Sequence, residues 1–138
     1  MVVTRSLSVK TQGNCDIIDI TSQISNELSQ SVINNGIITI FISGSTAGIS
    51  TIEYEEGVID DFKIMWDRNI PKNITYRHDS KWGDGNGFSH VRASLLGASL
   101  VVPFSNKKLL LGTWQQIIVI DFDNRPRSRE IALQLIGE

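Results

Sequence analysis

The stretch Ser99–Ile136, SLVVPFSNKKLLLGTWQQIIVIDFDNRPRSREIALQLI, decides the fold class, because strand-forming runs follow one another with only short turns between them. Turn-forming residues occupy positions 105–107 and 123–126. The runs predicted as strands are Ser99–Phe104, Leu109–Leu111, Trp114–Phe122 and Arg129–Ile136. Consecutive strands joined by tight turns predict an antiparallel meander over this part of the chain.

Upstream of this stretch, strands alternate with amphipathic helices. Ile37–Ile42 is apolar at nearly every position and rich in β-branched residues, which predicts a central strand covered on both faces. Further strands are predicted at Val3–Val9, Asp16–Ile20 and Ile49–Tyr54.

Helices are predicted where apolar residues recur at three- and four-residue spacing between capping residues. They run from Thr21 or Ser22 to about Asn34 with the apolar face Ile24, Leu28 and Val32, between Gly57 and Pro71, and from about Ser89 to Leu96. The whole pattern predicts an α+β fold with mixed or antiparallel sheets, two or three covering helices and one domain over residues 1–138.

Composition and charge exclude two classes of partner. The formal charge is −2 and the Lys and Arg residues are scattered, so no basic surface for nucleic acid is expected. The longest apolar runs fall far short of the ~20 residues that span a bilayer, and the first residues show no signal-peptide pattern. The single cysteine, Cys15, suits a reducing compartment, so we expect a cytoplasmic protein with no membrane partner.

The only two imidazoles of the chain, His78 and His90, lie within its most polar and glycine-rich stretch. A short extended piece at Ile74–Arg77 is predicted to lead into His78 and then into a polar loop at Ser80–Gly87. With Asp84, or with Asp79, the imidazoles could form a three-donor site for a divalent ion such as Zn²⁺. We assign proton transfer to His78 and His90, and metal binding or orientation of an imidazole to Asp84, against the alternative of imidazoles hydrogen-bonded within a loop. This hypothesis requires both imidazoles to face one cavity.

Anion-binding groups are predicted on two segments. Asn86, Gly87 and Ser89 precede or open a helix, and free N–H groups at a helix N-terminus can hold a phosphate, although such a pattern is also an ordinary turn and cap. Arg127 and Arg129 offer guanidinium groups that bind oxyanions bidentately, with a solvated turn as the alternative. Together they predict a small phosphorylated ligand.

Two further polar side chains are candidates for ligand binding. Thr113 and Gln115 flank Trp114 on a predicted strand, so they face the side opposite the indole. Either Trp114 is in the core and the two polar residues line a pocket, or the reverse. Trp82 lies in the polar loop and could cover a ligand.

A set of short motifs resembles the YjbQ-like family over nearly the whole chain. The motifs are Asp84-Gly85-Asn86, Ser89-His90, Ala93, Gly97, Ser99-Leu-Val-Val-Pro103, Gly112-Thr113-Trp114-Gln115 with Ile117, Arg127, Arg129 and the closing Gly137-Glu138. The resemblance implies a compact α+β fold, a homotrimer with sites near the subunit boundaries, and a divalent metal, Mg²⁺ or Zn²⁺. One departure is that many relatives carry His-Thr-(Thr or Ser)-Ala where this chain has Gly44-Ser45-Thr46-Ala47, so a site relying on that imidazole would be altered here.

The resemblance leads to two hypotheses of function. Many family members are labelled secondary thiamine-phosphate synthase, which implies a transferase that joins a phosphorylated thiazole to a pyrimidine carried as its pyrophosphate ester. The second hypothesis is a non-catalytic binding protein for a small anionic or phosphorylated ligand, which the absence of a His at Gly44 favours. A purely structural trimeric scaffold would need neither imidazole for ligand binding.

Overall fold

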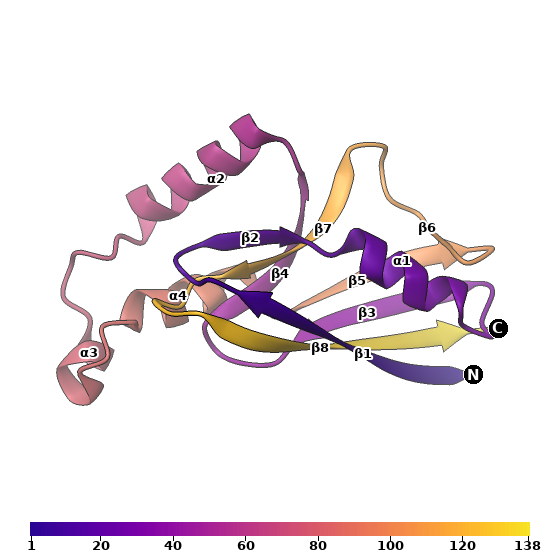
Figure 1. Ribbon diagram of the computed structural model, residues 1–138, viewed down its shortest axis with the longest axis horizontal. Coiled ribbons are helices and arrows are strands. Elements are labelled where there is room, and N and C mark those ends of the chain that lie inside the picture. Colours follow the sequence, from indigo (N-terminus) through magenta and orange to yellow (C-terminus); the bar gives the residue numbers. More distant parts are fainter.

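The computed structural model describes residues 1–138 as two antiparallel sheets and four helices (Figure 1). The larger sheet has the order β1 (Val2–Thr11), β8 (Arg127–Gly137), β3 (Gly36–Ile42), β5 (Ser99–Ser105) and β6 (Lys108–Leu109). The smaller sheet has the order β2 (Asp16–Asp19), β7 (Gln115–Asp121) and β4 (Ala47–Glu53). The predicted α+β class with antiparallel sheets is confirmed.

The C-terminal strands exist as predicted but do not form a meander. Only β5 and β6 pair with each other, whereas β7 pairs with β2 and β4, and β8 pairs with β1 and β3. The physical reason lies in β7, because Ile117–Ile120 are all fully buried. A strand buried on both faces needs a layer above and below it, and β7 obtains this as the centre of the smaller sheet.

Two apolar clusters fill the spaces between the layers. The larger one lies between the two sheets and includes Ile24 and Leu28 of α1 (Thr21–Ser29). The smaller one joins the other face of β7 to Trp66 of α2 (Glu56–Asn69) and Ala93 of α4 (Gly87–Leu96). None of the helices has the length and hydrophobicity needed to cross a membrane.

Two of the predicted elements differ in the structure. Helix α1 ends at Ser29 rather than near Asn34, so Val32 is exposed and does not extend its apolar face. A helix, α3 (Arg77–Trp82), takes the place of the end of the predicted extended piece and of the first three residues of the predicted loop. It ends at Gly83 in the left-handed conformation that glycine adopts without a Cβ penalty. Its six residues bury no side chain, so no apolar periodicity marks it in the sequence.

Strand β3 is central in its sheet, as predicted, but only one of its faces is covered within the chain. Ile38, Ile40 and Ile42 are fully buried, while Ile37 and Phe41 are 41% and 45% exposed. Val101 on β5, which pairs with Thr39 of β3, is exposed on the same face. The larger sheet therefore presents an apolar outer face.

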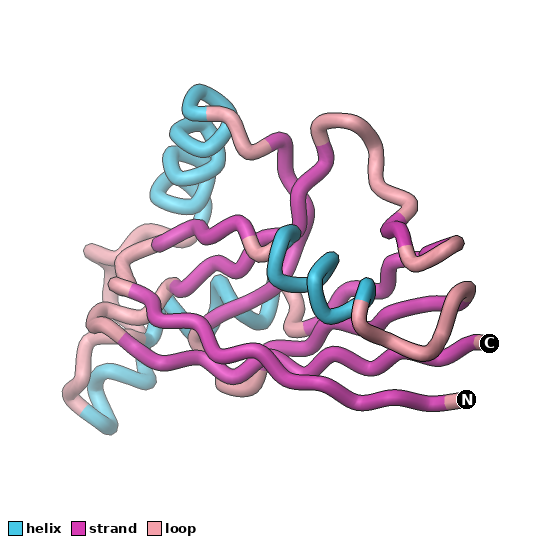
Figure 2. The backbone as a smooth tube through the Cα atoms, turned by 45° about the vertical axis from the view of Figure 1, so that its right-hand side comes forward, coloured by secondary structure: helices cyan, strands magenta, loops and turns pink.

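The turn between β7 and β8 and the α3–α4 segment lie together at the end of the molecule opposite the two termini (Figures 1 and 2). The turn between β3 and β4 approaches them, since Phe122 N–H donates to the Thr46 carbonyl. This end of the fold holds the candidate site.

Candidate functional site

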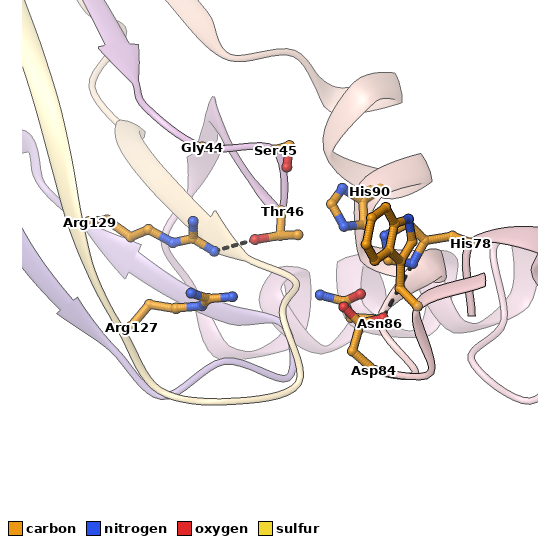
Figure 3. Close-up of a pocket in the computed structure, with 10 residues that line it drawn as sticks. Gly44, Ser45, Thr46, His78, Asp84, Asn86, His90, Arg127 and Arg129 are labelled. Atoms are coloured by element: carbon orange, nitrogen blue, oxygen red, sulfur yellow. Dashed lines mark hydrogen bonds and ion pairs between the residues drawn. The ribbon is translucent and has the colours of Figure 1, made fainter. Parts of the chain in front are cut away.

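A cavity of about 470 Å³ opens where these three segments meet (Figure 3). We call it the His–Arg cleft. Its lining residues are Gly44, Ser45, Thr46, His78, Trp82, Asp84, Asn86, His90, Arg127 and Arg129. The expectation that both imidazoles face one cavity is confirmed, and both predicted arginines face the same cavity.

The two imidazoles are in contact. His78 on α3 and His90 on α4 have ring centroids 4.4 Å apart and ring planes inclined by 41°. Nδ1 of His78 lies 3.4 Å from Oδ1 of Asp79 and 3.4 Å from Oδ1 of Asp84. The short helix α3 thus turns His78 towards two carboxylates, which an extended segment would not do.

A group of donor atoms that could hold a metal ion includes two residues of this wall of the cleft, His78 and Asp84. One donor atom each from His78, Asp79 and Asp84 lies within 4.8 Å of the others. Imidazole nitrogen with carboxylate oxygens fits a divalent ion such as Zn²⁺, and is a poorer match to the all-oxygen preference of Mg²⁺. His90 is outside this set, so Asp79 takes the place that the sequence hypothesis gave to His90 as a third ligand.

The opposite wall carries the two arginines, each held by a buried carboxylate. Arg129 donates through Nε and Nη2 to both oxygens of Asp121, at 2.7 and 2.9 Å. Arg127 donates through Nε and Nη2 to Oδ2 of Asp123, at 3.0 and 2.7 Å. Thr46 joins the two pairs, because its hydroxyl accepts from Arg129 at 2.6 Å and donates to Asp123 at 3.0 Å.

Asp123 is ionised at all but very acidic pH. Burial by itself would raise the pKa of this carboxyl group, but hydrogen bonds outweigh it. The backbone N–H of Asn124 donates first, followed by the side chains of Asn86, Arg127 and Thr46, and together they hold the pKa at about 2. A permanent negative charge therefore lies behind the arginine wall.

Each guanidinium keeps one nitrogen free of hydrogen bonds within the chain. Nη1 of Arg127 and Nη1 of Arg129 take part in no hydrogen bond, while the other nitrogens of both groups are bound. Gly44 lies directly against Arg129, since a Cβ at this position would be 2.7 Å from Nη1. The missing side chain at Gly44 leaves that nitrogen accessible from the cleft.

Asn86 links the two walls of the cleft (Figure 3). Its Nδ2 donates to Oδ1 of Asp123 at 3.2 Å, and its Oδ1 is buried with no hydrogen-bond partner. Because the Asp123 carboxylate only accepts hydrogen bonds, it fixes the orientation of the amide and leaves the oxygen unpaired. An unpaired buried acceptor marks a place where a donor from a ligand or a water would be favourable.

The backbone N–H groups of Gly87 and Ser89, which were predicted to bind phosphate at the start of α4, are already hydrogen-bonded within the chain. The Gly87 N–H donates to Asp79 at 2.8 Å, and the Ser89 N–H donates to the Asn86 carbonyl at 2.9 Å. Ser89 is fully buried, and its hydroxyl also donates to the Asn86 carbonyl. Gly87 and Ser89 therefore shape the α3–α4 connection, and only Asn86 of this group lines the cleft.

Thr113 and Gln115 lie in a different cavity, with Thr51 and Glu53 of β4 among its lining residues. Gln115 donates through Nε2 to Thr51 at 3.2 Å, and Trp114 is 73% exposed, so it is not a core residue. Within the chain, these residues do not join the His–Arg cleft. Trp82, by contrast, lines the cleft from its exposed position on α3.

Asp121, Asp123 and the binding role of Thr46 were missed by sequence reasoning. The sequence signal was a pair of acidic residues before the turn, Asp121-x-Asp123, and a pair of basic residues after it, Arg127-x-Arg129. Side chains two residues apart on a strand point to the same face, so these four charges could have been paired in advance.

Comparisons with known proteins agree on one family. Residues 5–138 match the family model described as UPF0047 protein YjbQ-like. A UPF0047 protein of Methanothermobacter thermautotrophicus is 38% identical over 137 residues, which cover 99% of this chain and 94% of the relative. YugU of Bacillus subtilis, also a UPF0047 protein, is 31% identical over 134 residues, which cover 96% of this chain and 98% of YugU.

Solved structures show the same fold. A YbjQ-like protein of unknown function from Sulfolobus solfataricus superposes with a TM-score of 0.89 at 29% identity, covering 100% of both chains. An uncharacterised protein of the yjbq/upf0047 family from Clostridium acetobutylicum gives a TM-score of 0.86 at 33% identity, covering 96% of this chain and 99% of the other. The resemblance inferred from the sequence motifs is confirmed.

Proposed function

The chain belongs to the UPF0047 protein YjbQ-like family, and from the geometry of the His–Arg cleft we propose that it binds a small phosphorylated molecule together with a divalent cation. One observation carries the proposal. Arg127 and Arg129, each with an Nη1 that makes no hydrogen bond, line the same cavity as His78 and Asp84, whose donor atoms lie within 4.8 Å of a donor atom of Asp79.

The charges around the cleft explain why a cation is part of the proposal. The two guanidinium charges are offset by Asp121 and Asp123, and Asp79 and Asp84 add two more carboxylates. With neutral imidazoles, the formal charge of this group is negative, which disfavours a phosphate alone. A divalent cation in the His78, Asp79 and Asp84 set would neutralise that formal charge and would help to stabilise charge on a phosphoryl oxygen.

The two imidazoles take different roles under this proposal. His78 belongs to the convergent donor set, so its nitrogen is committed to the cation. His90 lies outside that set, lines the same cleft and is free to exchange a proton with the ligand.

The narrower proposal is a transferase that releases phosphate or pyrophosphate as its leaving group. Negative charge grows on the leaving oxygen as its bond breaks, and the guanidinium groups that line the cleft would stabilise it. A thiamine-phosphate synthase activity is one such transfer and rests on the family resemblance. The alternative is a binding protein without turnover that uses the same contacts.

Binding is tested by titration calorimetry with inorganic phosphate and with pyrophosphate, each with and without Zn²⁺ or Mg²⁺. We expect pyrophosphate to bind in the presence of the divalent ion, and Arg127→Gln to weaken it by roughly 10- to 100-fold, the usual effect of losing a charged hydrogen bond. Arg125→Gln is the matched control, because Arg125 lies on the same turn, is exposed and does not line the cleft.

Equal affinity of Arg127→Gln and the parent chain, or no binding under any of these conditions, would overturn the proposal. Turnover is then tested by incubating the phosphorylated thiazole with the pyrimidine pyrophosphate ester and the divalent ion. Formation of thiamine phosphate that is lost in His90→Gln supports the transferase. Binding of pyrophosphate without any product supports the non-catalytic alternative.

A further inference from the structure

Asp84 is held differently from the other two donors of the proposed cation site, His78 and Asp79. Those two lie on α3, and Oδ1 of Asp79 accepts a hydrogen bond from the Gly87 N–H at 2.8 Å. Asp84 lies in the loop between α3 and α4, with its Oδ1 3.4 Å from Nδ1 of His78 (Figure 3). Its carboxylate makes no hydrogen bond within the chain, so its position depends on the backbone that carries it.

The backbone on both sides of Asp84 is glycine. Gly83 and Gly85 both have left-handed φ angles, +72° and +68°. The N–H groups of residues 84–86 make no hydrogen bond within the chain. Glycine has no Cβ to restrict rotation of the backbone, so a loop of this kind moves easily unless another part of the chain fixes it.

Asn124 fixes this loop from the turn between β7 and β8. Its Nδ2 donates to the Asp84 carbonyl at 2.8 Å, which is the one hydrogen bond that Asp84 makes. The same nitrogen lies 3.8 Å from the point where a Cβ would stand on Gly85, so the amide contacts the loop backbone. Asn124 is exposed and does not line the cleft. A side chain outside the cleft therefore holds a donor that lies inside it.

The turn that carries Asn124 is itself fixed by the arginine wall. The Asn124 N–H donates to Oδ1 of Asp123 at 2.8 Å, and Asp123 is fully buried and paired with Arg127. The same Oδ1 accepts from Nδ2 of Asn86, the last residue before α4. The turn thus holds the loop at two points, the carbonyl of Asp84 and the side chain of Asn86.

We propose that Asn124 is a positioning residue for the cation site: by fixing the Asp84 backbone, it keeps the Asp84 carboxylate beside His78. This inference rests on the proposed function, since it gives Asn124 a part in binding the divalent ion. Residues that orient a metal ligand contribute to the affinity for the metal without touching it.

The test measures Zn²⁺ affinity by competition with a chelating dye. Asn124→Ala should weaken binding by roughly 3- to 10-fold, the usual effect of losing one hydrogen bond. Asn124→Asp keeps the shape of the side chain but replaces the donor with an acceptor, so it should weaken binding as well. An added negative charge by itself attracts a cation. Tighter binding in Asn124→Asp would therefore assign Asn124 a purely electrostatic role and overturn the proposal.

The Asp84→Ala background distinguishes positioning from a general loosening of the site. There, Asn124→Ala should change the Zn²⁺ affinity by no more than about twofold, because the carboxylate that Asn124 positions is gone. A loss by the same factor in both backgrounds would show that Asn124 does not act through Asp84 and would overturn the proposal. If Asp84→Ala binds no Zn²⁺, the two single variants of Asn124 decide.

Asn73→Ala is the matched control, because Asn73 is an exposed asparagine between α2 and α3 whose side chain makes no hydrogen bond. It should bind Zn²⁺ as the parent chain does, and thermal unfolding without the ion checks that every variant is folded. Unchanged affinity in Asn124→Ala would overturn the positioning role while leaving the cation site intact. Absence of Zn²⁺ binding by the parent chain would overturn the cation site and the positioning role together.

Discussion

Replacement of Asp123 by asparagine should remove a defined part of the acid sensitivity of the fold. Asp123 is fully buried, and its pKa is about 2 against 3.8 for an unperturbed group. That difference corresponds to about 2 kcal/mol of folding free energy, since one pKa unit is ~1.4 kcal/mol. The sign follows from the depressed folded pKa: the unfolded chain binds the proton more readily, so this stability is present above pH 3.8 and is lost as the pH falls towards 2.

The slope of stability against pH gives the sharpest measurement. Near pH 3 the unfolded carboxyl is mostly protonated and the folded one mostly ionised, so this residue alone contributes about 1 kcal/mol per pH unit. Urea unfolding at several pH values between 2 and 7 gives the free energy of unfolding for the parent chain and for Asp123→Asn. The variant should lose about 2 kcal/mol at neutral pH, because it lacks the ionised carboxylate that these hydrogen bonds stabilise, and its slope near pH 3 should be shallower.

Asp60→Asn is the control, since Asp60 is an exposed carboxylate on α2. It should keep both the neutral-pH stability and the acid slope of the parent chain. A slope near pH 3 that is the same in Asp123→Asn and in the parent chain would refute the reasoning, because the hydrogen bonds to Asp123 would then not favour its charged form.

Three further predictions concern the metal, the core and the assembly. His78→Gln should weaken Zn²⁺ binding by about tenfold or more, measured by competition with a chelating dye. His90→Gln should change the affinity by no more than about twofold, because only His78 is in the donor set. Equal losses of affinity in the two variants would contradict the assignment. Ile40→Ala should destabilise the fold by about 2–5 kcal/mol in urea unfolding, since Ile40 is fully buried on β3, and a loss below 1 kcal/mol would show that the core relaxes around it. The homotrimer proposed from the family resemblance should sediment with three times the 15.4 kDa mass of one chain. If the outer face of the larger sheet is the subunit interface, Val101→Lys on that face should weaken the trimer. Sedimentation of the parent protein as a single chain would rule the trimer out.

The sequence allowed a close prediction of the elements that depend on local pattern. The strands around Ile38 and Ile118 and the helices that bury Leu28 and Trp66 follow from apolar periodicity, and the structure has them. Pairing could not be predicted in the same way, because a period of two identifies a strand but not its neighbour. The chain carries β7 into the smaller sheet, and nothing between Leu109 and Gln115 signals that change of sheet.

The candidate site was predictable where a rare residue type marked it. The two imidazoles stand out because the chain has only two, and the structure places both in one cleft with Arg127 and Arg129. Common residue types were harder to judge. Ser89 is a residue type that often binds anions at the start of a helix. Here its N–H and its hydroxyl both donate to the Asn86 carbonyl, and the sequence alone does not predict such hydrogen bonds within the chain.

The arginine wall of the cleft is also the seam between the two sheets. Asp121 ends β7 of the smaller sheet, and Arg129 lies on β8 of the larger one, so their ion pair joins the layers across the turn that contains Asp123. Under the proposed function, replacement of a charge in this seam would change ligand binding and folding together, since the same guanidinium would serve both. His78 and His90 lie on α3 and α4, outside the seam. Substitutions of the imidazoles should consequently affect the site without changing the free energy of unfolding. For Arg127→Gln, a loss of binding has to be compared with the free energy of unfolding of the same variant.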